Sequence, residues 1–160
     1  METTDDFDFS LIIHHHGWST CFIFIDGKQV ELTISHVFGD PYHDFIYALK
    51  RLMKGEFETQ FYWYGEPGGE RITINRIKDR QHKIHVTVEG FSESYGDEIK
   101  QFDTTTEFEC TQKAFLTMAY LQLKKIALLM QDSSYSKSRN GDFPFQLFHE
   151  FEMEVKNCLG

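Results

Sequence analysis

The histidines are the residues of this chain best suited to metal chemistry. His14 to His16 are adjacent, and His36 follows the next predicted hairpin. Because strand side chains alternate between two faces, His14 and His16 could share a face, with His36 nearby. A zinc site needs three or four converging ligands, usually completed by a carboxylate or thiolate. We predict polar strand residues here, with no metal and no cofactor; a small-molecule-binding domain or enzyme with a His-containing pocket is the alternative.

Nucleophilic catalysis finds little support in the sequence. No GxSxG motif is present, and the three cysteines are widely separated without a CxxC pair. Cys110 precedes a predicted helix, where amide dipoles could lower a thiol pKa, although packing is the more common role of such a cysteine. Carboxylates are abundant, but no spacing selects a general acid and base. We therefore predict that the protein is not an enzyme.

A glycine-rich corner interrupts two strand-like stretches in "FYWYGEPGGERITI", residues 61–74. A phosphate-binding loop would need GxxxxGK[ST] followed by a helix, whereas a strand follows here. We interpret the corner as a hairpin connection in which glycines adopt positive φ. Both faces of the preceding strand are aromatic, so Tyr62 and Tyr64 either pack in the core or serve in recognition.

The same stretch carries a resemblance. "WYGEPGGERITINR", residues 63–76, is similar to a pattern in small bacterial proteins, some of which look like immunity proteins encoded beside polymorphic or contact-dependent toxins. The resemblance implies a cytoplasmic antitoxin-like protein that binds and blocks a toxin domain. It implies no catalytic residues.

The net charge of −9 agrees with a basic protein partner and argues against nucleic acid. We predict a non-enzymatic protein-binding module in which acidic and aromatic side chains occlude a toxin's basic active site. A homodimer through an exposed Phe22 and Phe24 face is a further hypothesis. The residues predicted to bind the partner are Tyr62, Tyr64, Glu66, Glu70, Glu93, Asp97 and Glu98.

The elements that must position these residues follow from periodicity. Alternating runs surround Asp26-Gly27, a strong hairpin signal, and set the register from Ile25 opposite Lys28 to Ser19 opposite Ile34. Asp40-Pro41 begins a helix that Gly55 ends. Further strands are predicted at 57–64, 71–77, 83–89 and 102–110, and helices at 111–131 and from 142 onward.

At 160 residues the chain fits a single domain, 1–160, with a flexible lead-in at 1–8 and a flexible loop at 132–142. We predict an α+β fold with one antiparallel sheet of five to six strands and three helices. Neither a signal-peptide pattern nor an apolar run of membrane-spanning length is present, so a cytoplasmic location without membrane contact is expected.

Overall fold

Two antiparallel sheets and four α-helices form the fold in the computed structural model, which describes residues 6–92 and 96–160. Within that part of the chain the sheet orders are β1-β2-β3 and β4-β5-β6-β7. Two short 3₁₀ helices, η1 and η2, complete the elements. The bounds are β1 (Phe7–Ile13), β2 (Trp18–Ile25), β3 (Lys28–Ser35), α1 (Pro41–Met53), β4 (Glu58–Tyr64), β5 (Gly69–Ile77), β6 (Arg80–Phe91), η1 (Gly96–Glu98), β7 (Asp103–Thr111), α2 (Gln112–Leu129), α3 (Ser133–Ser136), η2 (Asn140–Asp142) and α4 (Phe145–Leu159).

Strand β1 was not predicted, and it replaces part of the expected lead-in. Phe7, Phe9, Leu11 and Ile13 are all buried, with more exposed residues between them. Phe7, Phe9 and Leu11 alternate with the polar Asp8 and Ser10, which is the sequence pattern of a half-buried strand. The strand pairs with β2, from Phe7 opposite Ile25 to Ile13 opposite Ser19.

The free edge of β1 is covered by side chains from the C-terminal half of the chain. The Leu11 amide donates to Gln122 Oε1 at 3.0 Å, and Lys125 Nζ donates to the Leu11 carbonyl at 2.7 Å. Arg139 Nε donates to the Ile13 carbonyl at 3.0 Å. Burial lowers the pKa of the Lys125 amine. Backbone groups that already have a hydrogen-bond partner cannot pair with a strand of another molecule. These contacts therefore protect the edge at Leu11 and Ile13 from such pairing.

The hairpin of β2 and β3 has the predicted register. Ile25 lies opposite Lys28 and Ser19 opposite Ile34, with Asp26 and Gly27 both at positive φ in the turn. Cys21 and Leu32 lie on the buried face, as predicted. The opposite face carries Phe22, which is half-buried, and Phe24, which is 39% exposed.

Helix α1 begins and ends as predicted. The Asp40 side chain accepts a hydrogen bond from the His43 amide, Pro41 occupies the first turn, and Gly55 follows the end at φ 96°. Its buried face contacts the second sheet, where Trp63 Nε1 donates to the Pro41 carbonyl at 3.0 Å.

The second sheet contains the glycine-rich corner as a hairpin connection between β4 and β5, which confirms the structural interpretation. Gly68 and Gly69 both have positive φ. A Cβ atom on Gly68 would lie 2.3 Å from the Phe91 carbonyl oxygen, and one on Gly69 would lie 2.5 Å from that of Trp63. The glycines are therefore required because backbone passes this close to backbone.

The two predicted helices of the C-terminal part are present as α2 and α4. Thr111 caps α2, because its hydroxyl accepts from the Ala114 amide. The region predicted as a flexible loop, 132–142, contains α3 and η2. Asp132 caps α3 by accepting from the amides of Ser134 and Tyr135.

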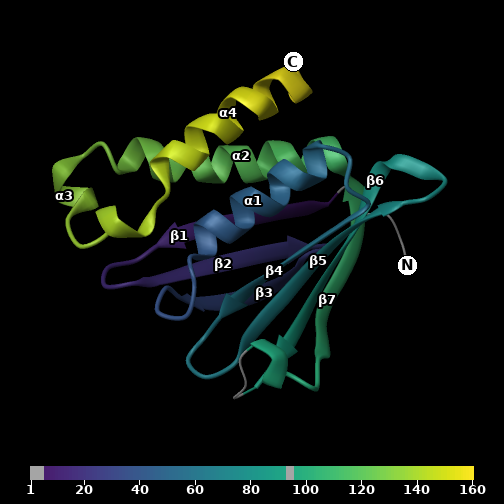
Figure 1. Cartoon of the computed structure of the whole chain (residues 1–160), viewed down its shortest axis with the longest axis horizontal. Helices are drawn as coiled ribbons and strands as arrows, with labels where there is room; N and C mark the ends of the chain where they lie inside the picture. The colour runs from purple at the N-terminus through teal and green to yellow at the C-terminus, as the bar shows by residue number, and fades with distance from the viewer. Residues whose placement is uncertain (1–5, 93–95) are drawn as a thin grey trace.

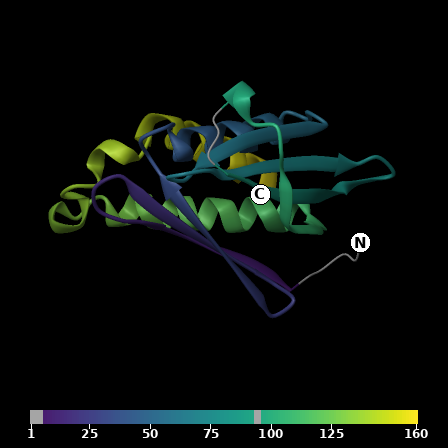
Figure 2. The same cartoon turned by 90° about the horizontal axis from the view of Figure 1, so that it is seen from below.

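The inner faces of both sheets contribute to one hydrophobic core with α1, α2 and α4. Phe7 of β1 stacks on Phe108 of β7 at 4.5 Å between ring centroids, and Phe9 contacts Phe45 of α1 and Phe115 of α2. The three long helices lie together along one side of the strands (Figure 1), and the strands of the first sheet run at a different angle from those of the second (Figure 2).

The α+β class is confirmed, whereas a single sheet of five to six strands with three helices is wrong. The strands divide into sheets of three and four, and the described residues include a fourth, short helix. The division falls between β3 and β4, where α1 intervenes in the chain. Hydrophobic periodicity marks each strand but does not specify which strands pair across a helix. No described helix combines the length and the apolar character needed to cross a membrane.

Candidate functional site: an acidic hollow

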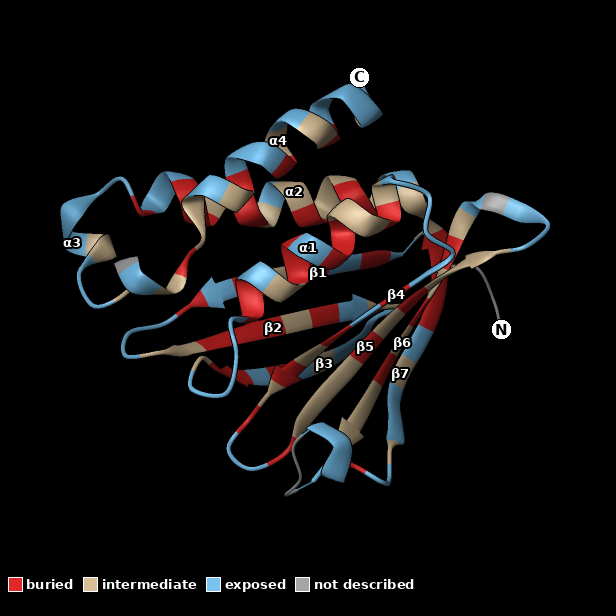
Figure 3. Ribbon diagram, in the orientation of Figure 1, coloured by how far each residue is buried: buried red, intermediate tan, exposed pale blue. Residues whose placement is uncertain are grey.

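A hollow of about 820 Å³ opens where the loop ends of the second sheet meet the first sheet. The β4–β5 corner, the ends of β5 and β6, η1 and the start of β7 form most of its wall. Trp18 and Thr33 complete it from β2 and β3. The ends of β5 to β7 near η1 are less buried than the parts of these strands below the helices (Figure 3). Four carboxylate residues line this acidic hollow: Glu66, Glu70, Glu98 and Asp103.

Glu70 is the most enclosed of the four carboxylates. Thr105 Oγ1 of β7 donates to Glu70 Oε2 of β5 at 3.1 Å. Gly90, on the intervening strand β6, lies directly opposite Glu70. Burial raises the pKa of the Glu70 carboxyl, and the hydrogen bond from Thr105 opposes this rise. Because burial disfavours the charged form of Glu70, a cation that binds beside this carboxylate stabilises that charged form.

Glu66 is held by the end of the first sheet. Ser35 Oγ donates to Glu66 Oε2 at 2.8 Å, and the Val37 amide donates to Ser35 Oγ at 3.2 Å. Ser35 is buried at 1% exposure, whereas Glu66 is exposed. These contacts attach the β4–β5 corner to β3 and orient one carboxylate at the rim of the hollow.

The four carboxylates have no ion-pair partner among the described residues, although Lys100 also lines the hollow. Ion pairs with lysine or arginine occur elsewhere on the molecule. Among the described lining residues the four carboxylates thus outnumber the single cation, Lys100, and the resulting negative field attracts cations. The pairs elsewhere include Lys50–Glu150, Arg51–Glu56, Arg71–Glu89, Arg80–Glu109 and Lys124–Glu152.

The structure brings together some of the predicted partner-binding residues and separates others. Glu66, Glu70 and Glu98 share the hollow, and Asp97 is exposed beside Glu98 in η1 without lining it. Glu93 lies outside the described residues.

Tyr62 and Tyr64 lie apart from these carboxylates. Their rings stack on each other, with centroids 5.8 Å apart, and both meet Phe91 edge-on. They line a second hollow of about 280 Å³ with Tyr47 and Arg51 of α1. The two half-buried tyrosines project from the opposite face of the second sheet to Glu70, because Tyr62 pairs with Arg71 whereas Glu70 pairs with Trp63.

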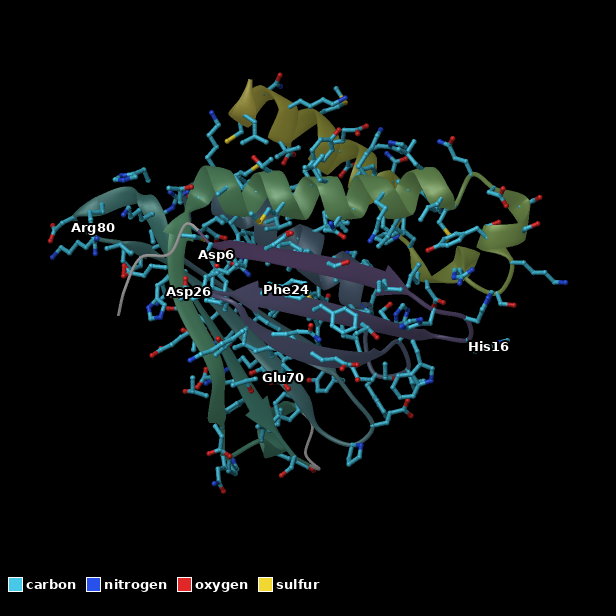
Figure 4. The ribbon with its side chains drawn as sticks, turned by 180° about the vertical axis from the view of Figure 1, so that it is seen from behind. Asp6, His16, Phe24, Asp26, Glu70 and Arg80 are labelled. Atoms are coloured by element: carbon cyan, nitrogen blue, oxygen red, sulfur yellow. The ribbon has the colours of Figure 1, made fainter. Side chains whose placement is uncertain are left out.

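The histidines considered for metal binding point to different partners. His14 Nε2 bonds Thr20 Oγ1 at 2.8 Å, His16 lies at positive φ in the β1–β2 turn, and His36 bonds Ser19. Figure 4 shows His16 at the far end of the first sheet from Asp26. The described residues contain no group of three or more histidine, cysteine or acidic side chains placed to hold a metal ion.

His36 belongs to a buried chain of polar groups. Asp142 Oδ1 lies 3.2 Å from His36 Nδ1, His36 Nε2 lies 2.7 Å from Ser19 Oγ, and Ser19 Oγ lies 2.8 Å from the Tyr42 hydroxyl. Burial lowers the pKa of His36, against a smaller rise caused by Asp142 and Asp40. The neutral ring thus donates from Nδ1 to Asp142 and accepts from Ser19.

This order of groups matches the Asp-His-Ser arrangement of serine hydrolases, but its surroundings are those of a structural network. Ser19 has no exposed surface, and the Tyr42 hydroxyl occupies its remaining side. A nucleophile needs access to a carbonyl carbon and a nearby oxyanion site. The network instead joins β2, the residue that follows β3, α1 and η2.

Cys110 is packed in the core rather than activated. It lies in β7, is 2% exposed, and burial raises its pKa to about 12. The thiol is therefore protonated near neutral pH, as the packing interpretation predicts.

Sequence reasoning missed Asp103, Gly90 and Ser35 as parts of this surface. Asp103 begins β7 and lines the hollow, and Ser35 ends β3 as the donor to Glu66. Gly90 and Asp103 are placed beside Glu70 by the pairing of β5 with β6 and of β6 with β7, and Ser35 is placed by the approach of β3 to the β4–β5 corner. Local sequence gives no signal for either arrangement.

Comparisons of the chain with protein-family models, curated proteins and solved structures find no match. The fold and the site define an α+β protein with an acidic hollow set between two sheets.

Proposed function

We propose that this chain is a binding protein whose acidic hollow receives cationic side chains of a partner protein. In line with the resemblance at residues 63–76, the proposed partner is a basic toxin domain whose active-site cleft the chain occludes in the cytoplasm. The observation that carries the proposal is the convergence of Glu66, Glu70, Glu98 and Asp103 without a lysine or arginine ion pair among the described residues.

Electrostatics explains why such a site suits a protein partner. Complementary charge accelerates encounter and selects against acidic competitors. A hollow of 820 Å³ with an exposed rim accommodates several side chains of a segment. The chain's overall charge of −9 adds a long-range attraction to a basic domain.

The test measures binding to the C-terminal toxin domain encoded by a neighbouring gene, and to a hexa-arginine peptide as a defined basic probe. The hollow variant is E98K/D103K, which changes two exposed residues. The matched control is E58K/D79K, which makes the same charge change at two exposed residues that do not line the hollow.

We expect the hollow variant to weaken binding of both probes about tenfold or more, mainly through slower association and with reduced salt dependence. The control should retain most of the affinity. Equal weakening by the two variants would show that net charge alone acts, and undiminished binding by E98K/D103K would reject the hollow as the site.

A further inference from the structure

The outer face of the first sheet, opposite its buried face, carries an apolar ridge. In β2 it presents Phe22 and Phe24, and the neighbouring β1 presents Ile12. Phe24 is 39% exposed and Ile12 is 37% exposed, and the half-buried Phe22 lies between them along the same face, so the three side chains form one apolar strip. Figure 4 shows Phe24 and Glu70 on the side of the molecule away from α1.

Carboxylates lie beside both phenylalanines in the sheet. Asp8 of β1 pairs directly with Phe24, and Glu31 of β3 pairs directly with Phe22. Side chains of directly opposed residues on one face of a sheet lie within contact distance. Asp8 and Glu31 are both exposed, and neither has an ion-pair partner among the described residues.

The outward positions of these three strands contain no lysine or arginine. They alternate with the buried positions and consist of acidic, apolar, amide and hydroxyl residues: Asp8, Ser10, Ile12, Trp18, Thr20, Phe22, Phe24, Gln29, Glu31, Thr33 and Ser35. The ridge is thus an apolar strip with negative charge at both sides.

The ridge is continuous with the acidic hollow. Trp18 and Thr33 belong to the outward positions of β2 and β3, and both also line the hollow. One elongated partner segment can therefore contact the hollow and the ridge together.

We infer that the ridge is the second half of the partner-binding surface and that its occupant is a basic segment of the partner protein. This inference rests on the function proposed above. Lysine and arginine side chains combine an apolar stem with a cationic head. Their stems would lie on Phe22 and Phe24, where the ring faces attract cations, and their heads would reach Asp8 and Glu31.

A second copy of this chain fits the ridge poorly. A symmetric contact would bring the acidic ridges of two copies together, and each copy already carries a net charge of −9. A purely apolar occupant would remove these carboxylates from water without a compensating charge.

The experiment maps backbone amide shifts of the ¹⁵N-labelled full chain during titration with hexa-arginine, and with hexa-glutamate as a negative control. We expect shifts at Ser10, Phe24 and Glu31 as well as at Glu70 and Thr105. Phe24→Ser should weaken hexa-arginine binding about two- to fivefold, the amount that an exposed cation–π contact supplies. Leu121→Ser, at a 56% exposed position of α2, is the matched control and should leave affinity unchanged.

The outcomes separate this inference from the proposed function. Shifts confined to the hollow, with Phe24→Ser neutral, would overturn the inference and leave the proposed function standing. Shifts confined to the ridge would support the basic occupant there and reject the hollow, and shifts at neither site would reject both. A concentration-dependent dimer in sedimentation that Phe24→Ser abolishes would overturn the inference in favour of a second copy.

Discussion

Gly90 lies directly opposite Glu70 in the second sheet, and the space left by its missing side chain holds the Glu70 carboxylate. A Cβ atom at Gly90 would lie 3.3 Å from Glu70 Oε2 and 3.3 Å from Thr105 Oγ1. The position of the Glu70 carboxylate in the acidic hollow thus depends on the absence of a side chain at Gly90.

Gly90→Ala should move this carboxylate toward solvent. We expect the pKa of Glu70 to fall back toward its ordinary value of 4.5, because burial is the main cause of its rise. The free energy of unfolding should fall by about 1 kcal/mol, since the neighbours must adjust by only a few tenths of an ångström. Carboxyl carbon shifts followed through a pH titration measure the first effect, and an unchanged Glu70 titration would contradict it.

Glu70→Gln should raise stability at neutral pH while weakening partner binding. The folded pKa is raised, so between 4.5 and that value the folded state binds more protons than the unfolded chain. Stability therefore decreases as pH rises through this window, and the charge remains a cost above it. Urea unfolding of both proteins from pH 4 to 8 tests this, with the exposed Glu98→Gln as control. A variant that is less stable than the wild type at pH 7 would show that the carboxylate stabilises the fold.

His36→Gln should destabilise the protein by about 1–3 kcal/mol, because Ser19 and Asp142 lose a buried partner. The His36 pKa lies below its ordinary value of 6.5, so the unfolded chain takes up a proton first as pH falls. His36 therefore makes wild-type stability decrease as pH falls below about 6.5.

The variant should lose less stability than the wild type over the same acid range. Chemical denaturation at pH 7.5 and 5.5 measures both effects. His43→Gln, at a half-exposed position of α1, serves as control. Parallel pH profiles for wild type and His36→Gln would contradict the role assigned to His36.

Gly68→Ala should disrupt the corner that carries Glu66. The backbone is at φ 76°, and the added Cβ would meet the Phe91 carbonyl oxygen at 2.3 Å. We expect a loss of about 3 kcal/mol or more in the free energy of unfolding, because the clash is with backbone, which cannot move aside as easily as a flexible side chain. Gly141→Ala, where nothing lies within 4 Å of the added atom, should stay within about 0.5 kcal/mol of wild type. Comparable unfolding midpoints for the two variants would contradict the close approach.

Local sequence determined most of the elements. Alternation, together with the Asp26-Gly27 turn, specifies the β2–β3 register, because a one-residue slip would expose the buried face of the hairpin. Asp40 and Pro41 specify where α1 begins through short-range hydrogen bonding and a fixed φ. The same alternation is present in β1 at Phe7, Phe9 and Leu11, so that strand was predictable although we did not predict it.

Tertiary structure decided the division into two sheets and which residues line the hollow. Glu66 and Glu70 are neighbours in the chain, but Asp103 joins them only because β6 pairs with both β5 and β7. Ser35 reaches Glu66 only because β3 approaches the corner. Tyr62 and Tyr64, equally close in sequence, contact Phe91 and line another hollow. Periodicity reports which side of each element is apolar, whereas the packing of one element against another depends on contacts between residues far apart in the chain.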